Sequence, residues 1–281
     1  MKQERTFFEG NTGIPGLALF GRNSLSRAYS PLVSHTHEGL MEIVFLHRGV
    51  QQFRAGGRDY TIKGGEAFIT QPGEPHSTGG SPQETAEYHW IQLNLQQGDL
   101  LGLGPLAAAP LLEKLRGLTE RVRPVSAETA GFIRTGFLHM CRAGEAERAQ
   151  AALLLAAALY AWLDGDSKAP PALSPEIARA ASYAAAQLEE PLALDDLADK
   201  AGLSLSRFKA RFREETGETP RSYINRLKIQ QAQAFLRQGD SITAVSQRLG
   251  FSTPNYFATV FRRFTAMSPV EYARRSGGPD R

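Results

Sequence analysis

The stretch that decides the fold of the C-terminal third is Ile242-Thr243-Ala244-Val245-Ser246-Gln247-Arg248-Leu249-Gly250-Phe251-Ser252. Ser246 is small enough to let one helix approach the next closely, and Gly250 tolerates the positive φ that a tight turn requires. We expect Ser252 to cap the helix that follows the turn. A small residue, a glycine turn and a cap in this order are typical of a helix-turn-helix.

The same pattern occurs a second time, 48 residues earlier. The earlier copy reads Leu194-Asp195-Asp196-Leu197-Ala198 and, after two residues, Ala201-Gly202-Leu203-Ser204. After this glycine-apolar-serine element the offset becomes 49, which predicts one extra residue in the 252–255 turn. On the helix after each turn, phenylalanines at i and i+4 point inward together, namely Phe208 with Phe212 and Phe257 with Phe261. The repeat predicts two helix-turn-helix units, at residues 192–215 and 241–264.

The opposite face of each second helix is left free for a partner. These faces carry Ser206, Lys209, Ala210 and Arg213 in the first unit and Asn255, Ala258, Thr259 and Arg262 in the second. Residues near the start of such a helix can reach base edges in a major groove, whereas Lys and Arg more often meet phosphates. We expect these residues to contact double-stranded promoter DNA.

Residues 221–238 form one uninterrupted helical pattern between the two copies. At about 1.5 Å per residue this connector spans roughly 27 Å, which is compatible with two recognition helices in successive major grooves about 34 Å apart. The alternative is a plain helical bundle with duplicated packing. Packing explains the phenylalanine pairs, but it does not explain the glycine turns, caps and basic outer faces together.

The charge distribution agrees with a polyanionic partner for the C-terminal part alone. Residues 201–281 hold 14 Lys and Arg against 6 Asp and Glu, a net +8, and the whole chain carries +3, which leaves −5 for residues 1–200. The lone Cys141 and a start without an apolar core predict a cytoplasmic protein. The longest apolar run, 151–163, is shorter than the about 20 residues that cross a bilayer, so no membrane partner is expected.

The chain is long enough for two domains, and residues 164–175 form a polar, proline-rich linker between them. Ser174 and Pro175 then start a helical, DNA-binding domain at 176–281. Before the linker, glycines separate five predicted strands: Met41–Leu46, Gln51–Arg54, Arg58–Ile62, Ala67–Thr70 and Glu87–Leu95. We predict a small β-barrel or sandwich over 1–104 and three helices over 105–163.

A histidine pattern lies within the predicted strands. His35-Thr36-His37, Glu42 and Gly49, followed by Pro72-Gly73-Glu74-Pro75-His76, resemble the two cupin motifs, His-x-His-x4-Glu-x6-Gly and Pro-x-Gly-x2-His. The resemblance departs from the pattern where the proline directly precedes the glycine and where Gly80 replaces a final Asn. It implies a jelly-roll-like cupin barrel in which His35, His37, Glu42 and His76 converge.

Three uses of this cluster are open. Three imidazoles and a carboxylate suit a divalent transition metal, the same side chains can hydrogen-bond an organic effector, and they can form a satisfied structural cluster. Tyr88 and Trp90 share one face of their strand and suit stacking on a sugar ring, although core packing explains them equally well.

Over essentially its full length the sequence resembles the AraC family of bacterial transcription regulators. The most specific match is Gly250-Phe251-Ser252, Tyr256-Phe257, Phe261-Arg262 and Ser268-Pro269, closing with Tyr272. Two positions depart from the family pattern, Ser246 where Ala is usual and Ala266 where Gly is usual. The resemblance implies an activator that acts with RNA polymerase, a sugar-like effector in the barrel and no required cofactor. It also implies dimerisation through the 105–163 helices; the alternative is that these helices only cover the barrel.

Three functions compete at this point. A ligand-responsive regulator, which is not an enzyme, explains both halves of the chain. A cupin metalloenzyme, an isomerase or dioxygenase with an accessory DNA-binding domain, leaves the duplicated helix-turn-helix unexplained. An architectural DNA-bending protein needs no effector, and general binding that fades with salt would distinguish it from a reader of defined operators.

Overall fold

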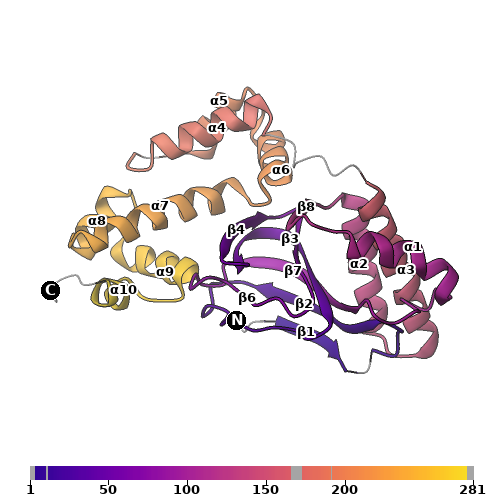
Figure 1. The fold of residues 1–281 in the computed structure, drawn as a ribbon. Coiled ribbons are helices and arrows are strands. Elements are labelled where there is room, and N and C mark those ends of the chain that lie inside the picture. The colour runs from indigo at the N-terminus through magenta and orange to yellow at the C-terminus, as the bar shows by residue number, and fades with distance from the viewer. Residues whose placement is uncertain (1–3, 11, 166–172, 191, 277–281) are drawn as a thin grey trace. The chain divides into compact units, whose positions relative to one another are not determined.

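The computed structural model describes residues 4–10, 12–165, 173–190 and 192–276, and it divides the chain into two compact units (Figure 1). The first unit contains the strands and helices α1–α3, and the second contains helices α4–α10. Most of the predicted 164–175 linker, residues 166–172, lies outside the described residues.

The first unit is built on an antiparallel sheet. Its strands are β1 (Glu4–Glu9), β2 (Leu17–Leu25), β3 (Leu40–Ala55), β4 (Arg58–Lys63), β5 (Glu66–Thr70), β6 (His76–Ser77), β7 (Ala86–Asn94) and β8 (Val122–Pro124). The main path runs in the order β1-β2-β7-β3-β5-β8, and β4 and β6 pair with the later half of β3. β3 therefore belongs both to the main path and to a smaller sheet.

The long strand β3 corrects one expectation. The predicted strands 41–46 and 51–54 are a single strand, so Gly49 does not divide them. Gly49 adopts φ +92°, and the pairing with β7 shifts register between Leu46 and Arg48, so the strand is irregular there without ending. The edge strand β1 was not predicted because its side chains are mostly exposed and polar and show no apolar alternation.

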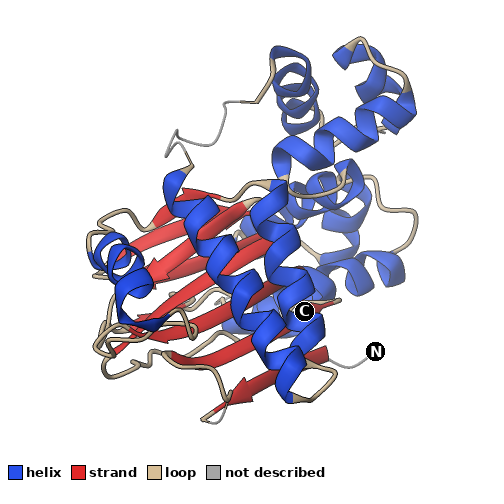
Figure 2. Ribbon diagram, turned by 90° about the vertical axis from the view of Figure 1, so that its right-hand side faces the viewer, coloured by secondary structure: helices blue, strands red, loops and turns tan. Residues whose placement is uncertain are grey.

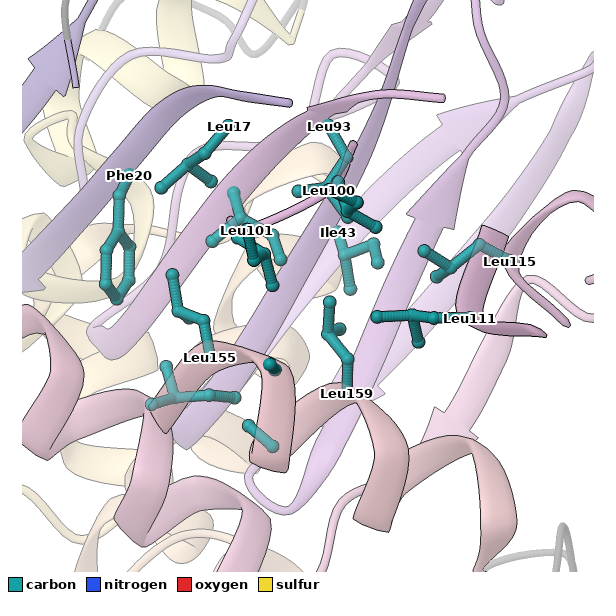
Figure 3. Packing of buried hydrophobic residues seen from close by; sticks show 14 of the residues in the cluster. Leu17, Phe20, Ile43, Leu93, Leu100, Leu101, Leu111, Leu115, Leu155 and Leu159 are labelled. Atoms are coloured by element: carbon teal, nitrogen blue, oxygen red, sulfur yellow. The ribbon is translucent and has the colours of Figure 1, made fainter. Parts of the chain in front are cut away.

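Helices α1 (Gly104–Arg116), α2 (Ala127–Met140) and α3 (Glu145–Asp164) lie across one face of the sheet (Figure 2). Met41, Ile43 and Phe45 alternate along β3 and point toward these helices, where they form the main core. Figure 3 shows Leu111, Leu155 and Leu159 of the helices packed toward Ile43. The three predicted helices are confirmed, and the inner face of α3 covers the sheet.

The other face of the sheet has its own apolar cluster. The alternate residues of β3, Val44 and Leu46, join Phe68 and Trp90 there, and the Phe53 ring stacks on Phe68 with centroids 4.6 Å apart. Because strand side chains alternate, Glu42 of β3 points to this second face, away from the helices. This face therefore combines apolar packing with a buried carboxylate.

Among the described residues from 173 onward, all regular elements of the second unit are helices; the unit also includes the short segments Ser26–Ser30 and Pro82–Thr85, which are joined by a bridge between Tyr29 and Gln83. Its helices are α4 (Pro175–Ala186), α5 (Leu194–Ala201), α6 (Leu205–Thr216), α7 (Pro220–Arg237), α8 (Ile242–Arg248), α9 (Pro254–Thr265) and α10 (Pro269–Arg275). The long helix α7 contributes Ile224 to a core with α4, α5 and α6, and Ile229 and Phe235 to a core with α8 and α9. The predicted fold class, a β domain with helices followed by two helix-turn-helix units on one long helix, is confirmed.

Candidate functional site

The two helix-turn-helix turns close in the same way. Gly202 and Gly250 adopt φ of +70° and +65°. The next residue in each copy donates its backbone N–H across the turn at 3.0 Å, to the carbonyl of Ala198 in the first and of Ser246 in the second. Both small residues are fully buried, as a close approach of the two helices requires. The sequence repeat is thus a structural repeat.

The caps of the two recognition helices, α6 and α9, differ. Ser204 is the N-cap of α6, although its side chain makes no capping bond. In the second copy the prediction that Ser252 caps the helix is wrong. Thr253 is the N-cap of α9, and its hydroxyl accepts a hydrogen bond from the Tyr256 backbone N–H at 3.1 Å. The extra residue in the turn moves the cap by one position and places Pro254 in the first turn of the helix, where its missing N–H costs nothing.

Each recognition helix has one buried and one free face. The phenylalanine pairs are buried in both copies, with ring centroids 5.4 Å apart in α6 and 5.6 Å in α9. The residues predicted to face DNA are exposed, namely Ser206, Lys209, Ala210, Arg213, Asn255, Thr259 and Arg262, whereas Ala258 is half-buried. Tyr256, beside Asn255, is an exposed aromatic that the sequence analysis did not select, although its place in the first turn of α9 was a signal.

The histidine cluster forms on the second face of the sheet. The Glu42 carboxylate lies 3.2 Å from the Nε2 atoms of both His37 and His76 and accepts a hydrogen bond from the Gln92 amide at 2.9 Å. His35 completes the group, with its ring centroid 4.2 Å from that of His76. One ligand atom from each of His35, His37 and His76 can lie within 4.8 Å of the others. The structure therefore brings together the four residues of the two motifs.

Neighbouring groups orient the histidines. His35 and His76 exchange backbone hydrogen bonds of 3.0 Å, and His76 Nδ1 faces the Glu74 carbonyl at 3.1 Å. The Glu74 carboxylate pairs with both guanidinium nitrogens of Arg121, at 2.6 and 2.7 Å, which fixes the loop that carries His76. The carbonyl contacts of His76 and of His35, the latter to Val33 at 2.9 Å, use Nδ1 and leave Nε2 of each ring without such a contact.

Gln92 belongs to this site and was missed. It lies directly opposite Glu42 in the β3–β7 register and also contacts His37 Nε2 at 3.0 Å. The available signal was the strand alternation, because Gln92 follows Tyr88 and Trp90 at two-residue steps.

The electrostatics of the cluster favour a charged Glu42. Burial by itself raises the pKa of this carboxyl, but the adjacent His37 and His76 imidazoles and the hydrogen bond from Gln92 outweigh that effect and hold its pKa well below the usual range. Burial lowers the pKa of His35. For His76, burial works in the same direction, but the Glu42 carboxylate overcomes it and raises the pKa. The site is thus a buried anion surrounded by imidazoles.

Tyr88 and Trp90 share the cluster's face of β7, as predicted, but they are already engaged. The Tyr88 hydroxyl accepts a hydrogen bond from Asn23 at 2.8 Å. The Trp90 ring lies against Gly21, where a Cβ atom would come within 2.4 Å of the indole, and the Arg5 guanidinium stacks over it. The Trp90 side chain is therefore a packed wall rather than an open surface.

A groove of about 630 Å³ opens beside the cluster. Its lining includes the buried His76 together with Val33, Arg54 and Pro75. A molecule of modest size can therefore approach His76 from solvent.

These features define a class: a two-domain protein that offers two helix-turn-helix faces to DNA and carries a polar site in a separate β domain. Family models match both parts, a "Helix-turn-helix domain" at residues 197–275 and an "AraC-like ligand binding domain" at residues 27–163. The chain belongs to the AraC family of transcription regulators.

The chain is also similar to individual curated proteins and to solved structures. The HTH-type transcriptional activator RhaS of Escherichia fergusonii is 27% identical over 256 residues, covering 84% of this chain and 85% of that protein. RhaS of Citrobacter koseri is 40% identical over 81 residues, so the match spans 28% of this chain and 29% of that relative's length. An AraC-type regulator structure from Chromobacterium violaceum is 29% identical, covers 38% of this chain and 96% of its own, and has a TM-score of 0.35.

The family and these relatives are transcription regulators rather than enzymes. The metalloenzyme alternative is therefore set aside. In the part of the chain that the structure describes, no helix is long and apolar enough to cross a membrane.

Proposed function

We propose that this protein is an effector-responsive transcription activator. Residues 1–104 bind the effector, residues 105–163 dimerise, residues 164–175 form the linker, and residues 176–281 bind promoter DNA. The observation that carries the proposal is the presence of two exposed recognition faces and a buried polar cluster in one chain. We infer activation rather than repression because the RhaS relatives are transcriptional activators.

The two recognition helices contribute unequally to DNA binding. Lys209 and Arg213 give α6 strong polar contacts, with Ser206 and Ala210 beside them. Asn255, Ala258 and Thr259 give α9 a milder surface and less discrimination, and Arg262 meets phosphate. The Thr259 hydroxyl donates to the Asn255 carbonyl at 3.0 Å, which restrains its orientation.

The effector is a sugar-like small molecule that contacts His35, His37, Glu42 and His76. Tyr88 and Trp90, engaged by Asn23 and Gly21, lie beside the cluster but offer the effector no open stacking surface. The groove beside His76 gives it access. Binding shifts the population of DNA-competent molecules, so the site and the DNA surface are coupled without covalent chemistry.

The decisive experiment is a footprint on the upstream region of neighbouring genes, with and without sugars selected by thermal shift. His35→Ala is expected to keep the intrinsic DNA affinity and to lose the response to the sugar, and Lys209→Ala is expected to weaken DNA binding in either condition. Equal loss of DNA affinity in both variants would contradict this division of roles. Protection spread over all sequences would point to an architectural protein.

A second candidate for the cluster is a divalent transition metal, favoured by the three converging imidazoles. The donor set fits such an ion, since Nδ1 of both His35 and His76 is held by a backbone carbonyl and Nε2 is left for coordination. Elemental analysis of the purified protein, with His76→Ala as control, tests this. A metal content of the unaltered protein no higher than that of the His76→Ala variant would rule out the metal site.

The remaining partners follow from the same function. Promoter activation implies contact with RNA polymerase and a cytoplasmic location, where the DNA is. Homodimerisation through α2 and α3 is supported by Leu138 and Leu153, which are 58% and 65% exposed although nearby apolar residues of the same helices, Phe137 and Leu155, are buried.

A further inference from the structure

A pocket of about 490 Å³ lies inside the second unit, between the two helix-turn-helix units. Both helix-turn-helix units and the long helix α7 line this pocket. The polar residues of its lining are Lys209 from α6, Arg221, Asn225 and Lys228 from α7, Ser252 from the turn before α9, and Tyr256 from α9. Three of these side chains are cationic and the other three can donate hydrogen bonds. The lining is thus suited to an anion.

Lys228 is the most informative member. It is only 7% exposed, yet its ammonium donates to a neutral partner, the Leu249 carbonyl, at 2.7 Å and lies 5.7 Å from the centre of the Phe251 ring. Within the described ranges no carboxylate pairs with it, and burial lowers its pKa. A buried ammonium without a counter-ion is costly, because a desolvated charge needs an opposite charge to compensate it.

The cationic side chains at the rim of the pocket also lack acidic partners among the described residues. Lys209 and Arg221 are exposed, and neither has an acidic partner among the described residues. Asp195 is the one carboxylate in the lining, so the cations outnumber it three to one. The pocket therefore keeps a net positive charge that an entering anion would balance.

The position of the pocket indicates which anion. Lys209 belongs to the free face of α6, and Tyr256 adjoins Asn255 on the free face of α9. A duplex that places both helices in successive major grooves must carry a stretch of backbone across the space between them, and each strand bears a phosphate every 3.4 Å along the axis.

We propose that this pocket binds a backbone phosphate of the DNA segment between the two recognition helices. Arg221 and Lys209 pair with the phosphate, Asn225, Ser252 and Tyr256 donate to it, and Lys228 supplies charge from the floor. The contact fixes the two units in register on the duplex and carries no sequence information. This inference rests on the proposed DNA binding and adds a contact to it that centres on α7, between the two recognition helices.

The test uses the full chain and fluorescent duplexes of about 30 base pairs with two arbitrary sequences, because a phosphate contact needs no operator. Binding is measured from about 50 to 200 mM salt, where each phosphate contact contributes about 0.9 to the slope of log K against log salt. Arg221→Ala is expected to reduce the slope by about one on both duplexes. Arg237→Ala removes the same charge from the far end of α7 and is expected to keep the slope.

Arg221 is exposed, so this variant avoids the folding problem that a change at the buried Lys228 would bring. Asn225→Asp, which adds a negative charge to the half-buried lining, is expected to weaken binding to both duplexes about tenfold or more. Equal slopes for the Arg221 and Arg237 variants would overturn the proposal. So would a melting shift with inorganic phosphate that Arg221→Ala removes while the DNA slope is unchanged, since the ligand would then be a free anion. Failure of the unaltered protein to bind either duplex would instead refute DNA binding itself.

Discussion

At the scale of single residues, Ala266 marks a backbone position that suits glycine. It ends α9 with φ +59°, and the corresponding residue of the first repeat, Gly217, ends α6 with φ +77°. An L-residue with a Cβ atom is strained in this left-handed region, whereas glycine is not. The sequence departure at Ala266 is therefore a small loss of stability in the second unit.

We expect Ala266→Gly to raise the free energy of unfolding by about 0.5 kcal/mol, since relief of left-handed strain is partly offset by the greater freedom of glycine in the unfolded chain. The reverse change, Gly217→Ala, is expected to lower it by about 1 kcal/mol. Urea denaturation measures both. Opposite signs for the two variants support the interpretation, and a destabilised Ala266→Gly would refute it.

A second residue-scale feature is a histidine pair near α2, in which His89 is buried and His47 is half-buried. His47 Nε2 and His89 Nδ1 lie 2.7 Å apart, and His89 packs on the rings of Phe20 and Phe137. Burial, assisted by nearby arginines, lowers the pKa of His47 to about 4 and that of His89 to about 2. The charged groups around the pair are Arg22, Arg48, Glu87 and Arg134. Both imidazoles are therefore neutral in the folded protein.

This pair predicts that stability falls on acidification. The unfolded histidines take up protons below about pH 6.5 while the folded ones do not, so each ring costs up to about 1.4 kcal/mol per pH unit until the folded pKa is reached. The melting temperature of the first unit is expected to drop between pH 7 and pH 5. In the His47→Gln/His89→Gln variant, which cannot titrate there, the drop is expected to be smaller. An identical drop in both proteins would contradict the assignment.

At the scale of elements, the start of α9 depends on one hydroxyl. Thr253 caps this recognition helix and Pro254 fills its first turn, whereas Ser252, at the position expected from the first repeat, has no capping contact. The added residue in the turn thus changes which side chain satisfies the free N–H groups of the helix.

We expect Thr253→Ala to cost about 1 kcal/mol of stability and to weaken DNA binding, because the cap holds Asn255 and Tyr256 in the first turn of α9. Ser252→Ala, one residue away, is the matched control for the stability measurement alone, because Ser252 also belongs to the proposed phosphate site; it is expected to change stability by less than about 0.5 kcal/mol. Chemical denaturation and a binding titration measure both effects. A larger loss in the Ser252 variant would restore the cap assignment made from the repeat.

At the scale of the whole molecule, the helices after the sheet have two faces with different roles. The inner face of α3 buries Ala151, Leu155 and Leu159 in the core of the first unit. Its outer face leaves Leu153 in solvent, close in type and exposure to Leu138 of α2. The inner face of α3 therefore covers the sheet, and we propose dimerisation for the outer face alone.

We expect the unaltered chain to be a dimer by light scattering and the Leu138→Glu/Leu153→Glu variant to be a monomer, since two carboxylates would be desolvated in the interface. Leu106→Glu, a change at a leucine of α1 that is 93% exposed, is the control and is expected to leave the dimer intact. A monomeric unaltered protein at working concentrations would end the dimer proposal.

Features that repeat along the chain or depend on near neighbours could be predicted from the amino-acid sequence alone. The two glycine turns, the inward phenylalanine pairs, the long α7 helix and the exposed faces of α6 and α9 all follow from local spacing, and the structure has them as predicted. The two histidine motifs also predicted the cluster, because their residues and spacing match the two cupin motifs closely.

Features that depend on strand register and on partners distant in the sequence became known only from the packing of the folded chain. In the folded chain, Gln92 lies opposite Glu42, and the two predicted strands form the single strand β3. The Trp90 ring packs against Gly21, and Arg121 pairs with Glu74 in the loop that carries His76. Packing also brings Lys209, Arg221 and Tyr256 around one pocket from three separate helices. The physical reason is that periodicity fixes which side of an element a residue occupies, whereas the partner across the gap is fixed by how the elements pack.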